Sequence, residues 1–157
     1  MLTASPTAPA PERITTPEPA GSPVLLYDGE CGLCAGSVQF VLRHERPARQ
    51  RALRFAPLNG AFGTTLAGTH PELVGLDSVV WYQPGARETR QISCRSDAVL
   101  AVLSHLGGGW RLLAAVGRLV PRPLRDAMYR QVAHRRLTLA APACHLPTPT
   151  ERSRFLP

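Results

Sequence analysis

Two cysteines stand at a junction between two kinds of sequence pattern, and this junction constrains the fold more than any other feature. The apolar run Val24-Leu25-Leu26-Tyr27 is typical of a buried strand, and Asp28-Gly29 directly after it indicates a turn. From Cys34 to Leu42, apolar residues recur at helical spacing, which predicts a helix. Cys31 is therefore expected at the N-terminus of a helix that follows a strand.

The spacing of the two cysteines suits exchange between thiols and disulfides. Only a thiolate attacks a disulfide, and the unpaired amides and dipole of a helix N-terminus would stabilise the negative charge of Cys31. Cys34 lies three residues further on, so one helical turn brings its sulfur near that of Cys31. We therefore expect Cys31 to attack a substrate disulfide and Cys34 to resolve the mixed disulfide.

Acidic residues flank the cysteine pair. Asp28 and Glu30 carry negative charge, which raises the pKa of a nearby thiol, so we expect only moderate activation of Cys31. A suitably placed carboxylate can also relay protons, and Asp28 is the candidate for that role towards a buried Cys34. The alternative is that Asp28 is a turn residue that accepts hydrogen bonds from the backbone.

A Cys-x-x-Cys pair also occurs in other kinds of site. It can be half of a zinc site, which Cys94, Cys144 or His145 would complete, but the sequence holds no second Cys-x-x-Cys and no His-x-x-x-His. Covalent haem attachment needs a histidine directly after the pair, and Ala35 stands there. A pair of buried structural thiols is a third alternative. The sequence thus predicts no metal and no cofactor at this pair.

The length and composition indicate one folded domain behind a disordered tail. The 157 residues suffice for one ordinary domain, and 44% of them are hydrophobic. Residues 1–22 are rich in Pro, Ala, Thr and Ser, which predicts a disordered tail before a domain over residues 23–157. Prolines interrupt any signal-like run, no apolar run is long enough for a membrane span, and the four cysteines are too few for a disulfide framework. We therefore expect a soluble, cytoplasmic protein.

The net charge of +7 raises the question of an anionic partner. All 18 basic residues are arginine, and they are spread along the chain instead of clustering in a nucleic-acid-binding motif, which argues against nucleic acid. A series of arginines near the C-terminus is interpreted as a solvated helical face, namely Arg118, Arg122, Arg125, Arg135 and Arg136.

The remaining patterns predict an alternation of strands and helices. Strands are expected at 53–58, at 78–82 and near 89–92, and helices around 64–68, from an N-cap at Ser96 to about 106, over 110–119, and from Pro123 to about 137. With the first strand and helix, this is the order of a thioredoxin-like domain. The predicted fold is α/β, a three-layer thioredoxin-like fold with a small mixed sheet flanked by helices and extra C-terminal helices.

The segment Tyr27-Asp28-Gly29-Glu30-Cys31-Gly32-Leu33-Cys34 resembles the signature of the DCC-type thiol-disulfide oxidoreductases. The resemblance extends over nearly all of residues 24–157, through Arg54–Leu58, Leu76–Val80, Arg95–Ala98, Val120–Asp126 and Cys144–Pro147. It implies a thioredoxin-like fold and disulfide exchange, carried here by Cys31 and Cys34.

This chain departs from related patterns in two places. Thioredoxins proper place a cis-proline before the third strand, where Asp77-Ser78 stands here. Members of the DCC-type family often carry an aromatic-Gly segment before the last cysteine, where this chain has Leu137–Ala141. Cys94 is either an auxiliary thiol or a small buried side chain. Cys144 is expected to close the C-terminal segment onto the domain.

The leading hypothesis is a thiol-disulfide oxidoreductase of the protein-disulfide reductase type. Its partners would be a disulfide-containing protein or a low-molecular-weight thiol as substrate, and an external dithiol reductant. The alternative is a non-catalytic module that is either stabilised by zinc or binds an anion through its arginines. The sequence identifies neither the physiological substrate nor the direction of exchange.

Overall fold

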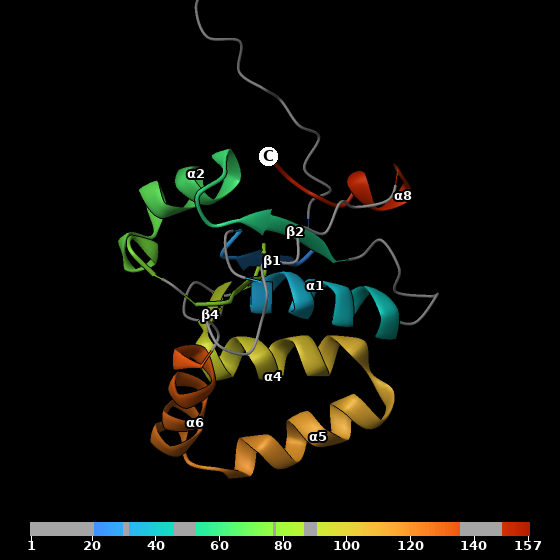
Figure 1. Ribbon diagram of the computed structural model, residues 1–157, viewed down its shortest axis with the longest axis vertical. Coiled ribbons are helices and arrows are strands. Elements are labelled where there is room, and N and C mark those ends of the chain that lie inside the picture. Colours follow the sequence, from blue (N-terminus) through green and yellow to red (C-terminus); the bar gives the residue numbers. More distant parts are fainter. Residues whose placement is uncertain (1–20, 30–31, 46–52, 77, 87–90, 136–148) are drawn as a thin grey trace, which may run out of the picture.

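The computed structural model describes residues 21–29, 32–45, 53–76, 78–86, 91–135 and 149–157. Its elements follow the predicted order of strands and helices (Figure 1). They are β1 (Val24–Tyr27), α1 (Gly32–His44), β2 (Arg54–Pro57), α2 (Ala61–Thr69), the 3-10 helix η2 (Pro71–Leu73), β3 (Val80–Tyr82), β4 (Ile92–Cys94), α4 (Arg95–Leu106), α5 (Gly108–Leu119), α6 (Arg122–His134) and α8 (Pro149–Arg152).

The four strands form one mixed sheet in the order β2-β1-β3-β4. β1 and β2 are parallel, with α1 in the crossover between them, as a parallel connection requires. β3 pairs antiparallel with β1, and Leu26 lies opposite Val80. β4 pairs antiparallel with β3, and Cys94 lies opposite Val80. The C-terminal end of β1, the start of β3 and the end of β4 therefore lie at the same end of the sheet.

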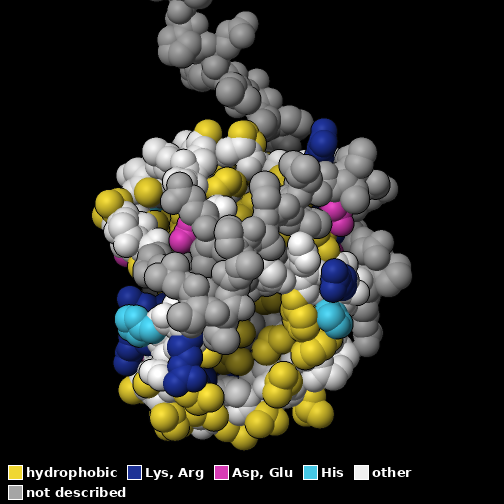
Figure 2. All heavy atoms as spheres, in the orientation of Figure 1, with side chains coloured by type: hydrophobic (Ala, Val, Ile, Leu, Met, Phe, Trp, Pro, Cys, Tyr) yellow, Lys and Arg dark blue, Asp and Glu magenta, His cyan; other side chains and the backbone are white. Residues whose placement is uncertain are grey.

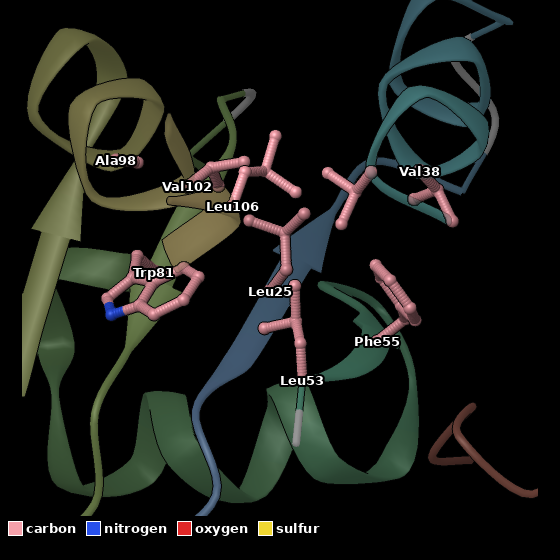
Figure 3. Packing of buried hydrophobic residues seen from close by; sticks show 9 residues of the cluster. Leu25, Val38, Leu53, Phe55, Trp81, Ala98, Val102 and Leu106 are labelled. Atoms are coloured by element: carbon pink, nitrogen blue, oxygen red, sulfur yellow. The ribbon is translucent and has the colours of Figure 1, made fainter. Parts of the chain in front are cut away.

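Alternate side chains of each strand point into two separate cores, which produces three layers. Leu25 points towards α1 and α4, between Val38 and Leu106, and Trp81 lies on the same face (Figure 3). Leu26 points to the opposite face, where it packs with Leu66 of α2 and other apolar residues. Apolar cover on both faces explains why β1 is a continuous apolar run. The predicted α/β, thioredoxin-like fold class is confirmed.

α5 and α6 lie outside this three-layer core (Figure 1). Both helices pack against α4. Gly107, at φ 73°, ends α4 in a conformation that favours glycine, and α5 begins directly after it. Within the described part of the chain, no helix has the length and apolar character needed to cross a lipid bilayer.

The C-terminal residues pair with the outer edge of β2, which the sequence did not predict. Phe155 forms a parallel bridge with Phe55. The Phe55 amide donates to the Arg154 carbonyl at 2.9 Å, and the Leu156 amide donates to the Phe55 carbonyl at 2.8 Å. The two phenylalanine rings stack with centroids 5.2 Å apart. The C-terminal segment therefore covers the free edge of β2.

Three local predictions differ from the structure. α2 is longer than the helix predicted around residues 64–68, and β4 lies later than the strand predicted near residues 89–92, of which 89 and 90 are outside the described residues. Ser96 is not the N-cap of α4, because Cys94 occupies that position and the Ser96 hydroxyl donates to the Asp126 carboxylate instead. The predicted tail falls almost wholly on residues 1–20, which are also outside the described part.

Candidate active site

The turn that carries the predicted catalytic residues begins at the C-terminal end of β1. The Leu58 amide donates to the Tyr27 carbonyl at 2.9 Å, so the turn after β2 is fastened to the end of β1. Asp28 follows at once and is half-buried. A Cβ on Gly29 would lie 3.6 Å from the Pro57 Cβ, which shows how closely the two turns approach. Burial raises the pKa of the Tyr27 hydroxyl beside them.

The helix predicted after the cysteine turn is α1, and Cys34 lies in its first turn. The first amides of a helix have no partner within the helix, so they present partial positive charge to the residues just before Gly32. The first turn contains no acidic residue that would offset this charge. Cys31 and Glu30 lie outside the described residues, as does the side chain of Cys34. The described geometry thus includes the start of the helix and Asp28, but not the two sulfurs.

Ser78 is a buried polar residue at this end of the sheet. Its side chain is 3% exposed, and no described group lies within hydrogen-bonding distance of its Oγ. β1 and β3 pair Leu26 with Val80, and continuing this register by two residues on each strand sets Asp28 opposite Ser78. A buried hydroxyl without a partner is uncommon, since it loses hydration without compensation. Ser78 belongs to the Asp77-Ser78 pair that was compared above with the cis-proline of thioredoxins proper.

The neighbouring Val79 is held by α6. The Val79 amide donates to the Tyr129 hydroxyl oxygen at 3.1 Å. α6 is in turn fastened to the start of α4, because Asp126 accepts the Ser96 hydroxyl and Arg125 lies 2.9 Å from Asp97. The hydrogen bond from Ser96, followed by the charge of nearby arginines, lowers the pKa of the Asp126 carboxyl.

This fastening corrects part of the interpretation of the arginine series. Arg125 is largely buried and ion-paired to Asp97, so it does not belong to a solvated face. Arg122 is exposed, although its Nε lies 3.1 Å from an Asp97 oxygen. Arg118 is exposed and donates to the Ser104 hydroxyl at 2.8 Å. Arg136 lies outside the described residues.

An apolar cleft of about 320 Å³ opens between α1 and α4, close to the cysteine turn. Ser37 of α1 and Val79 lie at its wall, with Val99 and Leu103 of α4 opposite. Figure 2 shows hydrophobic side chains lining a hollow on this face of the molecule. The cleft offers an apolar surface next to the first turns of α1.

Cys94 lies at the same end of the sheet, on the edge strand. It is half-buried, and burial raises the pKa of its thiol, which disfavours the thiolate. An open cleft of about 820 Å³ borders it, and Arg118 and Arg122 line the same cleft. No group of three or more potential metal-ligating side chains occurs among the described residues. Cys144 and His145, the other candidate zinc ligands, lie outside them.

The comparison with known protein families shows to which family the chain belongs. A family model described as DCC1-like thiol-disulfide oxidoreductase matches residues 25–141, which include the whole cysteine turn. The chain belongs to this family. Membership supports a general role as a thiol-disulfide oxidoreductase, in agreement with the resemblance noted from the sequence.

Two curated relatives extend the match along the chain. The uncharacterized protein YuxK of Bacillus subtilis is 33% identical over 147 residues, which cover 90% of this chain and 99% of YuxK. A DCC family protein of Arabidopsis thaliana, described as chloroplastic, is 32% identical over 120 residues, covering 74% of this chain and 64% of the plant protein. No solved structure gives a significant match.

Two residues at the site were not found by sequence reasoning as functional candidates. Ser78 was noted only as a departure from proline, and its burial without a partner depends on the packing of the whole sheet end. Tyr129 acts through a contact 50 residues away in sequence. No local pattern marks either residue, because the burial of Ser78 and the contact of Tyr129 with Val79 both depend on packing between distant segments.

Proposed function

We propose that this protein is a dithiol-disulfide oxidoreductase that uses Cys31 as nucleophile and Cys34 as resolving thiol. The observation that carries the proposal is that α1 begins at Gly32, directly after the turn that follows β1. This start leaves unpaired helix amides next to residue 31, where a thiolate would gain stabilisation. Family membership supports the same chemistry.

The proposed reaction is a pair of thiolate displacements. The Cys31 thiolate attacks one sulfur of the substrate disulfide, which forms a mixed disulfide and releases the first substrate sulfur as a thiolate. The Cys34 thiolate then attacks the Cys31 sulfur and releases the second substrate thiolate. The substrate gains two electrons, and a Cys31–Cys34 disulfide remains. An external dithiol reduces that disulfide and returns the enzyme to its starting state.

Asp28 is proposed as the group that accepts the proton of Cys34 before the second displacement. Asp28 is half-buried and directly follows the last residue of β1, at the start of the segment that leads into α1. Ser78 is a further candidate for contact with substrate, because its Oγ has no described partner and its register position is opposite Asp28.

The substrates are proposed to be protein disulfides, or disulfides of low-molecular-weight thiols, in the cytoplasm. Residues 23–157 are proposed as the working domain and residues 1–22 as a dispensable tail.

The apolar cleft between α1 and α4 favours a substrate with apolar side chains near its disulfide. Val79, Val99 and Leu103 would contact such side chains, while the reacting sulfur meets the start of α1. This feature supports a protein disulfide over a small, charged one.

The proposal is tested by reduction of a protein disulfide such as that of insulin, with a dithiol reductant present. Cys31→Ser should abolish turnover. Cys94→Ser is the matched control, since it also removes one thiol at the same end of the sheet, and it should retain turnover. Full activity of Cys31→Ser would contradict the proposal, as would loss of activity in Cys94→Ser alone.

A further inference from the structure

The outward face of α5 carries large aliphatic side chains. Leu112, Val116 and Leu119 are spaced four and three residues apart, so they form one stripe along the helix. They are 68%, 53% and 82% exposed. Figure 2 shows hydrophobic side chains gathered along the lower edge of the molecule, where Figure 1 draws α5, and at its lower left, where α6 begins.

The packing on α4 fixes this orientation of α5. Ala114 is fully buried on the inward face. A Cβ on Gly117 would lie 2.7 Å from the Leu100 Cδ2, so this face of α5 lies close against the Leu100 side chain of α4. Arg118 donates to the Ser104 hydroxyl of α4 from the same side. Ala114 and Gly117 thus face α4 and Trp110 packs against the core, while the aliphatic stripe faces outward.

α6 continues the apolar surface. Its residues Leu124, Met128 and Val132 recur every four positions, and each is more than half exposed. Together with the stripe of α5 they exceed the scattered apolar residues of an ordinary protein surface. Exposed apolar surface of this extent is typical of a site that contacts a protein partner or a membrane.

The net charge of α5 and α6 indicates that the partner is anionic. Residues 108–135 contain six arginines against one aspartate, a net charge of +5. Asp97 of α4 offsets part of this charge through its ion pairs with Arg122 and Arg125. Arg111 and Arg118, seven residues apart, lie on one side of α5 between the stripe and α4, and both are exposed although Arg118 also donates to Ser104. A second copy of the same surface would bring arginines against arginines, which disfavours self-association.

We propose that α5 and α6 form a docking surface for an anionic lipid membrane, with the aliphatic stripe inserted at the interface and the arginines beside lipid headgroups. Apart from Met128, the exposed apolar residues of α5 and α6 are aliphatic, and they include none of the aromatic side chains that are enriched at protein interfaces. An amphipathic helix with an aliphatic face and flanking arginines is suited to lie in the plane of a membrane surface.

The test is flotation of the full chain with vesicles of phosphatidylglycerol and phosphatidylcholine in equal parts, against vesicles of phosphatidylcholine alone. Wild type should float with the anionic vesicles and only weakly with the neutral ones. Raising the salt to about 1 M should release it, since surface charges are screened there. The variant Leu112→Gln Leu119→Gln should lower the partition coefficient between vesicles and water at least about tenfold, because both leucine side chains would be buried in the membrane on insertion.

Matched controls separate this surface from a general effect. Val74 is 71% exposed and follows η2, away from α5, so Val74→Gln should bind like wild type. Arg111→Gln should weaken binding to anionic vesicles, whereas Arg43→Gln, at an exposed position of α1, should not. Circular dichroism verifies that each variant is folded, and turnover of a soluble disulfide substrate should be unchanged in all four.

Three results would overturn the proposal. The first is equal flotation of wild type and the Leu112→Gln Leu119→Gln variant when both are folded. The second is failure of wild type to float with anionic vesicles. The third is a wild-type dimer that this variant abolishes, because the surface is then an interface between copies. None of these results depends on the role of Cys31.

Discussion

Arg154 and Glu45, 109 residues apart in the sequence, form a buried ion pair with 2.6 Å between the Arg154 Nη2 and the Glu45 Oε2. The Arg154 guanidinium also donates to the Leu53 carbonyl and lies over the Phe55 ring, 5.1 Å from its centroid. His105 holds the other Glu45 oxygen at 2.9 Å. The pair thus joins the end of α1, the end of α4 and the C-terminal segment.

Removing Arg154 should therefore destabilise the whole domain. Arg154→Ala leaves the fully buried Glu45 carboxylate without its guanidinium, which costs about 3–5 kcal/mol in the free energy of unfolding. Urea denaturation followed by circular dichroism measures the change. Arg152→Ala, at an exposed position two residues earlier, should cost less than about 1 kcal/mol. Similar stability of the two variants would show that the buried pair does not anchor the C-terminal segment.

Ser78→Ala should leave the free energy of unfolding unchanged or raise it by up to about 1 kcal/mol, because the buried Oγ has no described partner to lose. If Ser78 contacts substrate, KM for a protein disulfide rises while stability does not fall. Ser96→Ala is the control, and it should cost about 1–2 kcal/mol because that hydroxyl donates to the Asp126 carboxylate. A large loss of stability in Ser78→Ala would mean that its hydroxyl is already satisfied within the fold.

Alkylation should distinguish the cysteines by their pKa. At mildly acidic pH, iodoacetamide should modify Cys31 first, since helix amides favour its thiolate. Cys94 should react slowly at that pH and faster only in alkaline solution, because burial raises the pKa of its thiol above the usual value. Peptide mass spectrometry of timed samples measures each rate. Modification of Cys94 or Cys144 before Cys31 would assign the nucleophile elsewhere.

Replacing Asp28 should affect the second displacement more than the first. Asp28→Asn removes the proposed proton acceptor of Cys34, so release of substrate from the mixed disulfide should slow by about tenfold or more and its pH profile should move. The rate of alkylation of Cys31 should stay within a few-fold of wild type. Stopped-flow measurement of both steps separates them. An unchanged release rate would leave Asp28 with the role of a turn residue.

The segment around Cys31 and Cys34 shows which parts of the fold can be predicted from neighbouring residues in the sequence. The run at β1, the Asp28-Gly29 turn and the helical spacing after Cys34 depend on neighbours in sequence, so strand, turn and helix were predicted close to their observed bounds. The connection between β1 and β2 is also long enough for a crossover, and such a connection is typical of parallel strands, as observed. These features depend on periodicity and turn chemistry, which a single sequence contains.

The misses depend on contacts between distant segments. Ser96 has the chemistry of an N-cap, but the approach of α6 gives its hydroxyl a stronger acceptor in Asp126. The bridge between Phe155 and Phe55 joins residues 100 positions apart and has no turn or periodic signal of its own. The outward stripe of α5 was predicted only as a helix, because the direction in which it faces depends on the packing of the whole of α5 against α4.

The most direct measurement of the central claim is covalent trapping by Cys34→Ser. This variant keeps the attacking thiol and lacks the resolving one, so it should accumulate mixed disulfides through Cys31 that survive non-reducing electrophoresis and disappear on addition of a dithiol reductant. Cys31→Ser and the double variant Cys31→Ser Cys34→Ser should trap nothing. Trapping by Cys31→Ser but not by Cys34→Ser would reverse the two roles. Absence of trapping in both, with loss of folding in each, would contradict the account of this turn as a catalytic dithiol.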